Sequence, residues 1–98
     1  MCVYMVAYEN SPETASADRQ SLDNRFQSSC LHIYPGLCLI MSSSAYYVKE
    51  EVLQALGRRG CMVAKVSADY DYALPPQRSF LADSDLELLL PPRDSHTS

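Results

Sequence analysis

Residues 29–69 read SCLHIYPGLCLIMSSSAYYVKEEVLQALGRRGCMVAKVSAD, and this stretch decides the fold. Two short apolar runs at residues 30–34 and 37–42 are separated by a Pro-Gly pair, which is typical of a tight connection between two strands. A run with helical spacing follows at residues 45–56, and residues 61–68 form a third apolar run. The stretch therefore predicts the order strand, strand, helix, strand.

The residues that precede this stretch complete the pattern. Residues 2–9, CVYMVAYE, form another apolar run, and residues 11–28 are expected to form a largely polar helix. The resulting order predicts an α+β fold of the ferredoxin-like βαββαβ type, a four-stranded antiparallel sheet with two helices on one face. We assign residues 1–74 to this domain, 75–92 to a C-terminal linker and dimerising or covering element, and 93–98 to a disordered tail.

The two helices differ in the strength of their sequence signatures. The first is predicted to begin with Ser11 as its N-cap and Pro12 at its first position, and it carries only a thin apolar stripe. The second has a run of three serines, residues 42–44, that offers an N-cap, and Gly57 suits its C-cap. Its expected buried stripe follows the helical period. That stripe comprises Ala45, Val48, Val52, Leu53, Ala55 and Leu56.

Composition limits the class of protein. The 98 residues, of which 47% are hydrophobic, suffice for one domain. A net charge of −4 argues against broad nonspecific binding of nucleic acid, which requires a basic surface. No apolar run approaches the roughly 20 residues that span a membrane, and the N-terminus does not resemble a signal peptide, so the cytoplasm is the expected location. The four cysteines include no CxxC pair, and we expect free, buried thiols.

Apolar residues on both faces of the strands predict a second contact surface. The helices of such a fold cover one face of the sheet, yet the runs at 2–9 and 37–42 are apolar on both sides. A large exposed apolar patch indicates an interface, and we expect a homodimer to which the C-terminal segment contributes. The predicted interface comprises Tyr4, Val6, Cys38, Ile40, Leu86 and Leu88. The alternative is that residues 80–90, as a short helix or a strand, fold back over the open face. In the last strand we expect Met62, Ala64, Val66 and Ala68 to face inward.

The candidate catalytic groups are carboxylates. Glu9 closes the first strand, and Asp69 follows the last strand, which neighbours the first in this fold. If these strand ends meet, the two acids offer the oxygen ligands that Mg²⁺ prefers. The alternative is that both are solvated loop residues. No cofactor is expected unless the protein is a nuclease, in which case Mg²⁺ is implied.

Other side chains suggest binding rather than catalysis. His32 is expected to be a structural histidine, and Cys30, His32 and Cys38 lack a recognisable zinc spacing although their ligand types would suit that ion. Tyrosines are frequent at partner surfaces, where the ring packs and the hydroxyl remains hydrated. The residues that we select for binding a partner are Tyr8, Asn10, Arg58, Arg59, Tyr70 and Tyr72.

The segments VYMVAYEN, LHIYPGLCLIMSS, VKEEVLQAL and CMVAKVS, in this order, resemble the small CRISPR adaptation subunit (Cas-two) and its SinR-like and VapD-like relatives. The resemblance spans residues 1–68 and implies a ferredoxin-like homodimer. In some members it also implies a metal-dependent nuclease that uses the acid ending the first strand, a position held here by Glu9. The sequence departs from the family at this point, because Glu9 stands in place of the usual Asp and is followed by Asn10.

Three functions are consistent with these features. The first is a non-catalytic dimeric module of a defence or toxin-type system, which binds protein or nucleic acid. The second is a small acidic inhibitor of the anti-CRISPR kind, whose carboxylates occupy the nucleic-acid groove of a larger enzyme. The third is a Mg²⁺-dependent nuclease with Glu9 as a metal ligand. We expect the first.

Overall fold

The computed structural model of the chain describes residues 1–73 and 89–91. Within these residues the elements follow in the order β1 (Cys2–Tyr8), α1 (Ala15–Phe26), η1 (Gln27–Ser29), β2 (Cys30–Tyr34), β3 (Leu37–Ser42), α2 (Ala45–Leu56) and β4 (Cys61–Lys65). The predicted α+β class, with a four-stranded antiparallel sheet and two helices, is confirmed. Of the expected C-terminal element at 75–92, only residues 89–91 are described, and the expected tail at 93–98 lies outside the described residues.

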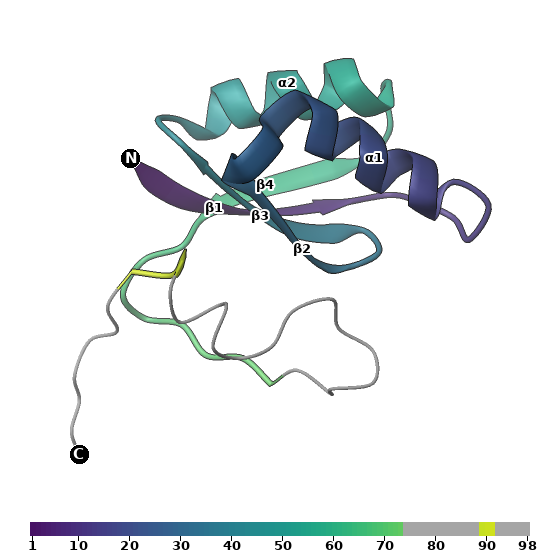
Figure 1. Cartoon of the computed structure of the whole chain (residues 1–98). Helices are drawn as coiled ribbons and strands as arrows, with labels where there is room; N and C mark the ends of the chain where they lie inside the picture. The colour runs from purple at the N-terminus through teal and green to yellow at the C-terminus, as the bar shows by residue number, and fades with distance from the viewer. Residues whose placement is uncertain (74–88, 92–98) are drawn as a thin grey trace.

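The strands lie in the order β2-β3-β1-β4, and each neighbouring pair is antiparallel. Strand β1 is therefore central and is hydrogen-bonded on both sides, to β3 and to β4. Figure 1 shows α1 and α2 side by side on one face of this sheet, while residues 66–73, which follow β4, pass along the opposite face. Among the described residues, no helix has both the length and the apolar content to cross a membrane.

The main core lies between the sheet and the two helices. Its most deeply buried side chains come from the sheet and from one stripe of each helix, because alternate strand residues point to the same face. They are Val6, Leu22, Cys38, Ile40, Val48 and Val52. This layer of apolar side chains holds α1 and α2 on the sheet.

Helix α2 forms as its sequence predicts. The Ser44 side chain accepts a hydrogen bond from the Tyr47 N–H at 3.1 Å, and Val48, Val52 and Leu56 form its buried stripe. Gly57 ends the helix with φ of 86°, a conformation that side chains with a Cβ rarely adopt.

Helix α1 begins later than predicted. The expected N-cap at Ser11 is wrong, because the chain first makes a turn in which the Thr14 N–H donates to the Ser11 carbonyl at 3.1 Å. The Thr14 hydroxyl lies within hydrogen-bond distance of both the Ser11 hydroxyl and the Asp18 carboxylate. These contacts make Thr14 the N-terminal boundary of a helix that runs from Ala15. Competition between local side-chain bonds and helical bonds explains the shift.

The orientation of β4 also differs from the prediction. Cys61 stands opposite Tyr8 and Val63 opposite Val6, and residues directly opposite one another share a face of the sheet. Because Tyr8 and Val6 belong to the core beneath the helices, Cys61 and Val63 pack there too. The expected inward set of Met62, Ala64, Val66 and Ala68 is therefore wrong by one position: Met62 and Ala64 are exposed, and Val66 packs on the other face of the sheet.

The cap of α2 can be tested by substitution. We expect Ser44→Ala to lower the free energy of unfolding by about 1 kcal/mol, because the Tyr47 N–H loses its acceptor. Urea denaturation followed by circular dichroism measures the change. Ser43→Ala at the exposed neighbouring position is the matched control and should change stability by less than about 0.5 kcal/mol. Equal losses in the two variants would contradict this role of Ser44.

Candidate functional site

Glu9 has a structural role at the end of β1. The Glu9 N–H donates to the Gly60 carbonyl at 2.9 Å, and the Gly60 N–H donates to Glu9 Oε1 at 2.6 Å. Gly60 precedes β4, so the two residues extend the pairing of β1 with β4 by a backbone bond and a side-chain bond. A Cβ at Gly60 would come within 2.9 Å of Glu9 Oε1, so a larger residue at this position would displace the Glu9 carboxylate from its hydrogen bond.

Asp69 lies at the opposite end of the same strand pair. Tyr8 stands opposite Cys61 and Tyr4 opposite Lys65, and the Val66 N–H donates to the Val3 carbonyl. The chain therefore reaches Asp69 beyond the start of β1, whereas Glu9 follows its end. A strand as long as β1 spans roughly 20 Å. The predicted joint ligation of one Mg²⁺ by Glu9 and Asp69 is thus wrong within a single chain, because antiparallel pairing separates the two strand ends.

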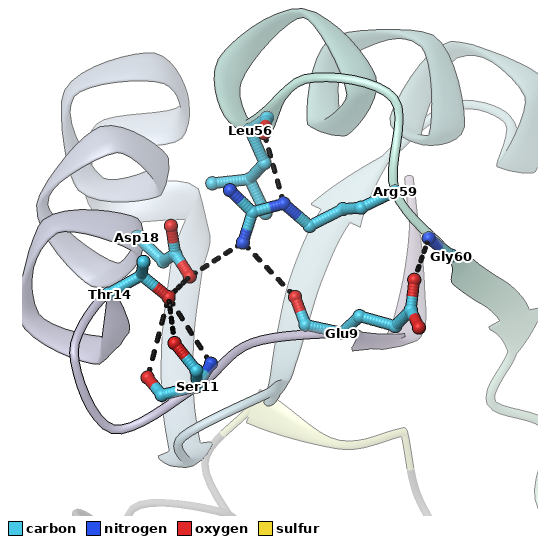
Figure 2. Close-up of polar contacts among 7 residues, drawn as sticks. All are labelled: Glu9, Ser11, Thr14, Asp18, Leu56, Arg59 and Gly60. Atoms are coloured by element: carbon cyan, nitrogen blue, oxygen red, sulfur yellow. Dashed lines mark hydrogen bonds and ion pairs between the residues drawn. The ribbon is translucent and has the colours of Figure 1, made fainter.

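Arg59 joins the two helices to the end of β1 (Figure 2). Its Nη1 donates to Asp18 Oδ2 at 2.8 Å and to the Glu9 carbonyl at 3.1 Å, and its Nε donates to the Leu56 carbonyl at 3.0 Å. Asp18 is only 4% exposed and also accepts a hydrogen bond from the Thr14 hydroxyl at 3.0 Å. The guanidinium therefore neutralises a buried carboxylate of α1, and it stabilises the fold whether or not a partner is present.

The residues selected for binding do not form one surface. Tyr8 is buried at the end of β1, and Asn10 follows it with its amide nitrogen buried and without a hydrogen-bond partner. Arg58 is exposed beyond α2. Tyr70 and Tyr72 belong to the segment on the other side of the sheet, where Tyr72 packs against apolar strand residues and the Tyr70 hydroxyl donates to the Pro91 carbonyl at 2.5 Å.

The interface residues expected from β1 and β3 lie on the wrong face of the sheet for that role. Tyr4, Val6, Cys38 and Ile40 are buried beneath the helices, so this part of the predicted interface is corrected. Both faces of these strands are apolar, and alternation alone does not tell which set the helices cover. The other two predicted interface residues, Leu86 and Leu88, lie outside the described residues.

The open face of the sheet is partly covered by the chain itself. Val3, Ile33 and Leu39 are buried there against side chains that include Val66 and Tyr72. Leu89 and Leu90 pack on the same group, as the fold-back alternative for the C-terminal segment predicts. A cavity of about 320 Å³ remains between this segment and the sheet. Its lining includes Met5, Ile33, Leu39, Val66, Tyr70, Tyr72 and Leu90.

A cluster of two thiols and one imidazole lies on the opposite face, beneath the helices. Cys30, His32 and Cys38 are all buried, and their ligand atoms lie within 4.8 Å of one another. His32 Nε2 is 3.7 Å from Cys30 Sγ and 2.8 Å from Oδ1 of Asp23 in α1. The sequence spacing gave no reason to expect this grouping, because the hairpin turn and not a short motif brings the three side chains together.

Contacts within this cluster shift the pKa values of its members. A hydrogen bond from Cys38 lowers the pKa of the Cys30 thiol; burial opposes that shift, and His32 reinforces it. Cys38 has a raised pKa because it donates this bond and is buried. Burial alone would lower the pKa of His32, but its contacts with Cys30 and Asp23 outweigh burial and raise it. The arrangement therefore favours a thiolate at Cys30 beside a protonated His32.

Comparison with known proteins does not identify a function for the chain. No protein family, curated protein or solved structure matches the chain. The geometry of its own residues therefore carries the functional argument.

Removal of the Arg59 guanidinium tests its structural role. We expect Arg59→Ala to lower the free energy of unfolding by roughly 2–4 kcal/mol, because the buried Asp18 carboxylate loses its counter-charge. Urea denaturation measures the loss. Arg58→Ala, at the exposed neighbouring position, is the control and should cost less than about 0.5 kcal/mol. The double variant Arg59→Ala with Asp18→Ala should recover part of the loss, and no recovery would contradict the pairing.

Proposed function

We propose that this chain is a small, non-catalytic binding module with the ferredoxin-like fold, which pairs with a second copy of itself through the open face of its sheet. The proposal places it beside the small CRISPR adaptation subunit and the SinR-like and VapD-like proteins, as the sequence resemblance implies. The single observation that carries it is an uncharged patch of methionines left exposed on the open face.

The connectivity supports the ferredoxin-like assignment. The order of elements is βαββαβ, and the strand order β2-β3-β1-β4 places the first and third strands at the centre of an antiparallel sheet. Both helices lie on one face (Figure 1). A split βαβ sandwich has this arrangement.

The methionine patch supports the pairing of two copies. Met5 and Met62 are 39% and 67% exposed, and the small Ala64 lies opposite Met5 and two residues from Met62, so these three residues are neighbours. Met41, 38% exposed, lies opposite Val3 toward the other end of β1. Strand alternation places all four on the open face, beside the half that Val66, Tyr72 and Leu90 cover. Apolar patches of adaptable methionines are typical of protein contact surfaces. The absence of charge among these four residues favours a second copy over nucleic acid as the partner.

The alternatives have less support. The nuclease alternative needs Glu9 as a metal ligand, but one oxygen of its carboxylate accepts a short hydrogen bond from Gly60, and Asp69 lies at the far end of the strand pair. The acidic inhibitor is consistent with the net charge of −4, and residues 1–73 and 89–91 add no further support for it. The free thiols are consistent with a reducing compartment such as the cytoplasm.

Light scattering coupled to gel filtration tests the dimer. The wild-type chain should elute with twice its mass of 11.0 kDa, and Met62→Lys should shift the population to the single chain because a charge at the centre of an apolar contact is costly.

Tyr47→Lys is the matched control. Tyr47 is 53% exposed on α2, in the layer that lies on the other face of the sheet, so the dimer should persist. A wild-type chain that remains a monomer across the concentration range would overturn the pairing. If Met62→Lys and Tyr47→Lys both dissociate the dimer, the open face is not the surface through which the two copies pair. Retardation of DNA or RNA by wild type in a gel-shift titration would favour a nucleic-acid partner instead.

A further inference from the structure

We propose that Cys30, His32 and Cys38, with Asp23 as a fourth ligand, form a binding site for one divalent metal ion of the Zn²⁺ type. The site lies beneath the helices and is independent of the methionine patch on the other face of the sheet. Three features support the site: the placement of Cys30, His32 and Cys38 on one hairpin, the distances between their ligand atoms, and the chemistry of the donor set.

The hairpin of β2 and β3 places the three buried ligands together. His32 stands directly opposite Cys38, and Cys30 precedes His32 by two residues, so all three side chains point to the helix-covered face. The register shift between His32 and Tyr34 occurs after these positions and leaves the pairing of His32 with Cys38 intact. A rigid pair of strands thus fixes two thiols and one imidazole in one small volume.

The distances agree with a tetrahedral site. Zn²⁺ binds sulfur at about 2.3 Å and imidazole nitrogen at about 2.0 Å, which in a tetrahedron separates the two ligand atoms by about 3.5 Å. Cys30 Sγ and His32 Nε2 are 3.7 Å apart. Every ligand atom of the three residues lies within 4.8 Å of the others, so shifts of about 1 Å or less in side-chain position bring them onto a common ion.

Asp23 completes the donor set from α1. Its Oδ1 is 2.8 Å from His32 Nε2, which is also the ring nitrogen nearest to Cys30 Sγ. Asp23 thus hydrogen-bonds the ring nitrogen that an ion would use, and this contact has to open before Asp23 can act as the fourth ligand of an ion held by Cys30, His32 and Cys38. A set of two sulfurs, one nitrogen and one carboxylate oxygen is typical of Zn²⁺ and unlike the all-oxygen sites of Mg²⁺ and Ca²⁺.

A disulfide is a poorer use of the same thiols. Cys30 stands opposite Ile40 and Cys38 opposite His32, so the two cysteines are diagonal neighbours on adjacent strands. Diagonal positions are about 7–8 Å apart, whereas the Cα atoms of a disulfide lie about 4.4–6.8 Å apart. The thiols are close enough to share an ion and their backbones are too far apart for an unstrained bond.

An ion can reach this position from outside. The Asp23 side chain is 42% exposed, whereas that of His32 is 4% exposed, so the carboxylate connects the buried ligands to solvent. His32 also lines a cavity of roughly 130 Å³ together with Tyr8, Ser16, Arg19 and Tyr34. A cavity of that volume has room for several waters, so a hydrated ion that loses its waters near His32 can release them there.

Titration of the metal-free, reduced full-length chain with Co²⁺ tests the site. We expect saturation at one ion per chain, with thiolate-to-cobalt charge-transfer bands in the near ultraviolet and the intense visible bands of tetrahedral cobalt. One equivalent of Zn²⁺ should abolish these bands by displacement and raise the thermal unfolding temperature of wild type.

The variants assign the ligands. Cys38→Ala should lose intensity in the thiolate-to-cobalt charge-transfer bands, and His32→Gln should lose the visible bands of tetrahedral cobalt. Asp23→Asn, which changes the most exposed ligand, should weaken binding roughly ten- to a hundredfold. Cys61→Ser is the matched control, since Cys61 lies outside the cluster, and it should keep the full spectrum. Circular dichroism before titration identifies any variant that fails to fold.

The site is refuted if folded wild type gives no tetrahedral cobalt spectrum and no thermal shift with Zn²⁺. It is equally refuted if Cys38→Ala retains the wild-type spectrum, because the ion would then lie elsewhere. If the Cys38→Ala chain is unfolded, the comparison of folded Asp23→Asn with Cys61→Ser still decides: equal affinities in these two would overturn the assignment of Asp23 as the fourth ligand.

Discussion

The pairing of β1 with β3 on one side and with β4 on the other determines which surface every strand residue occupies. Tyr4, Val6 and Tyr8 point toward the helices, and residues opposite them in the neighbouring strands are carried to the same layer. Leu22 of α1 and Val48 and Val52 of α2 fill the space above them. The remaining residues of the strands are necessarily turned to the other side. The fold thus produces two apolar layers from one sheet, and the two layers differ in what covers them.

The covering of each layer defines its chemistry. The helix side is closed by the amphipathic α2, by the largely polar α1 and by the Arg59 contacts that link α1, the end of α2 and the end of β1. Two thiols and one imidazole meet within this closed side, and the partly exposed carboxylate of Asp23 contacts the imidazole from α1. The open side is covered in part by Val66, Tyr72, Leu89 and Leu90 and keeps exposed methionines. The same four strands therefore present one face that the helices bury and one face that keeps exposed, flexible methionines.

Sequence patterns predicted the elements more reliably than their orientation. The apolar runs, the helical stripe of α2 and its caps were sufficient to give the order of strands and helices. They could not tell which face of β1 the helices cover, because Val3 and Met5 are as apolar as Tyr4 and Val6. The start of α1 was predicted too early, since side-chain bonds among Ser11, Thr14 and Asp18 replace a first helical turn. Long-range relations, such as the separation of Glu9 from Asp69, depend on strand direction and register, which short motifs do not contain.

The Pro35-Gly36 turn has a consequence for how this chain tolerates change in length. Gly36 adopts φ of 90°, and a Cβ there would approach the Tyr8 carbonyl to 3.0 Å, so the loop is held tightly against the neighbouring strand. Adding a single residue to the loop would slide the edge strand β2 past β3, which β1 holds in place, and would turn Cys30 and His32 to the far layer. The core would lose a buried sulfur and gain a side chain selected for a different environment. Homologous chains that keep this architecture should accordingly vary in the segment after β4 and conserve the number of residues between His32 and Cys38.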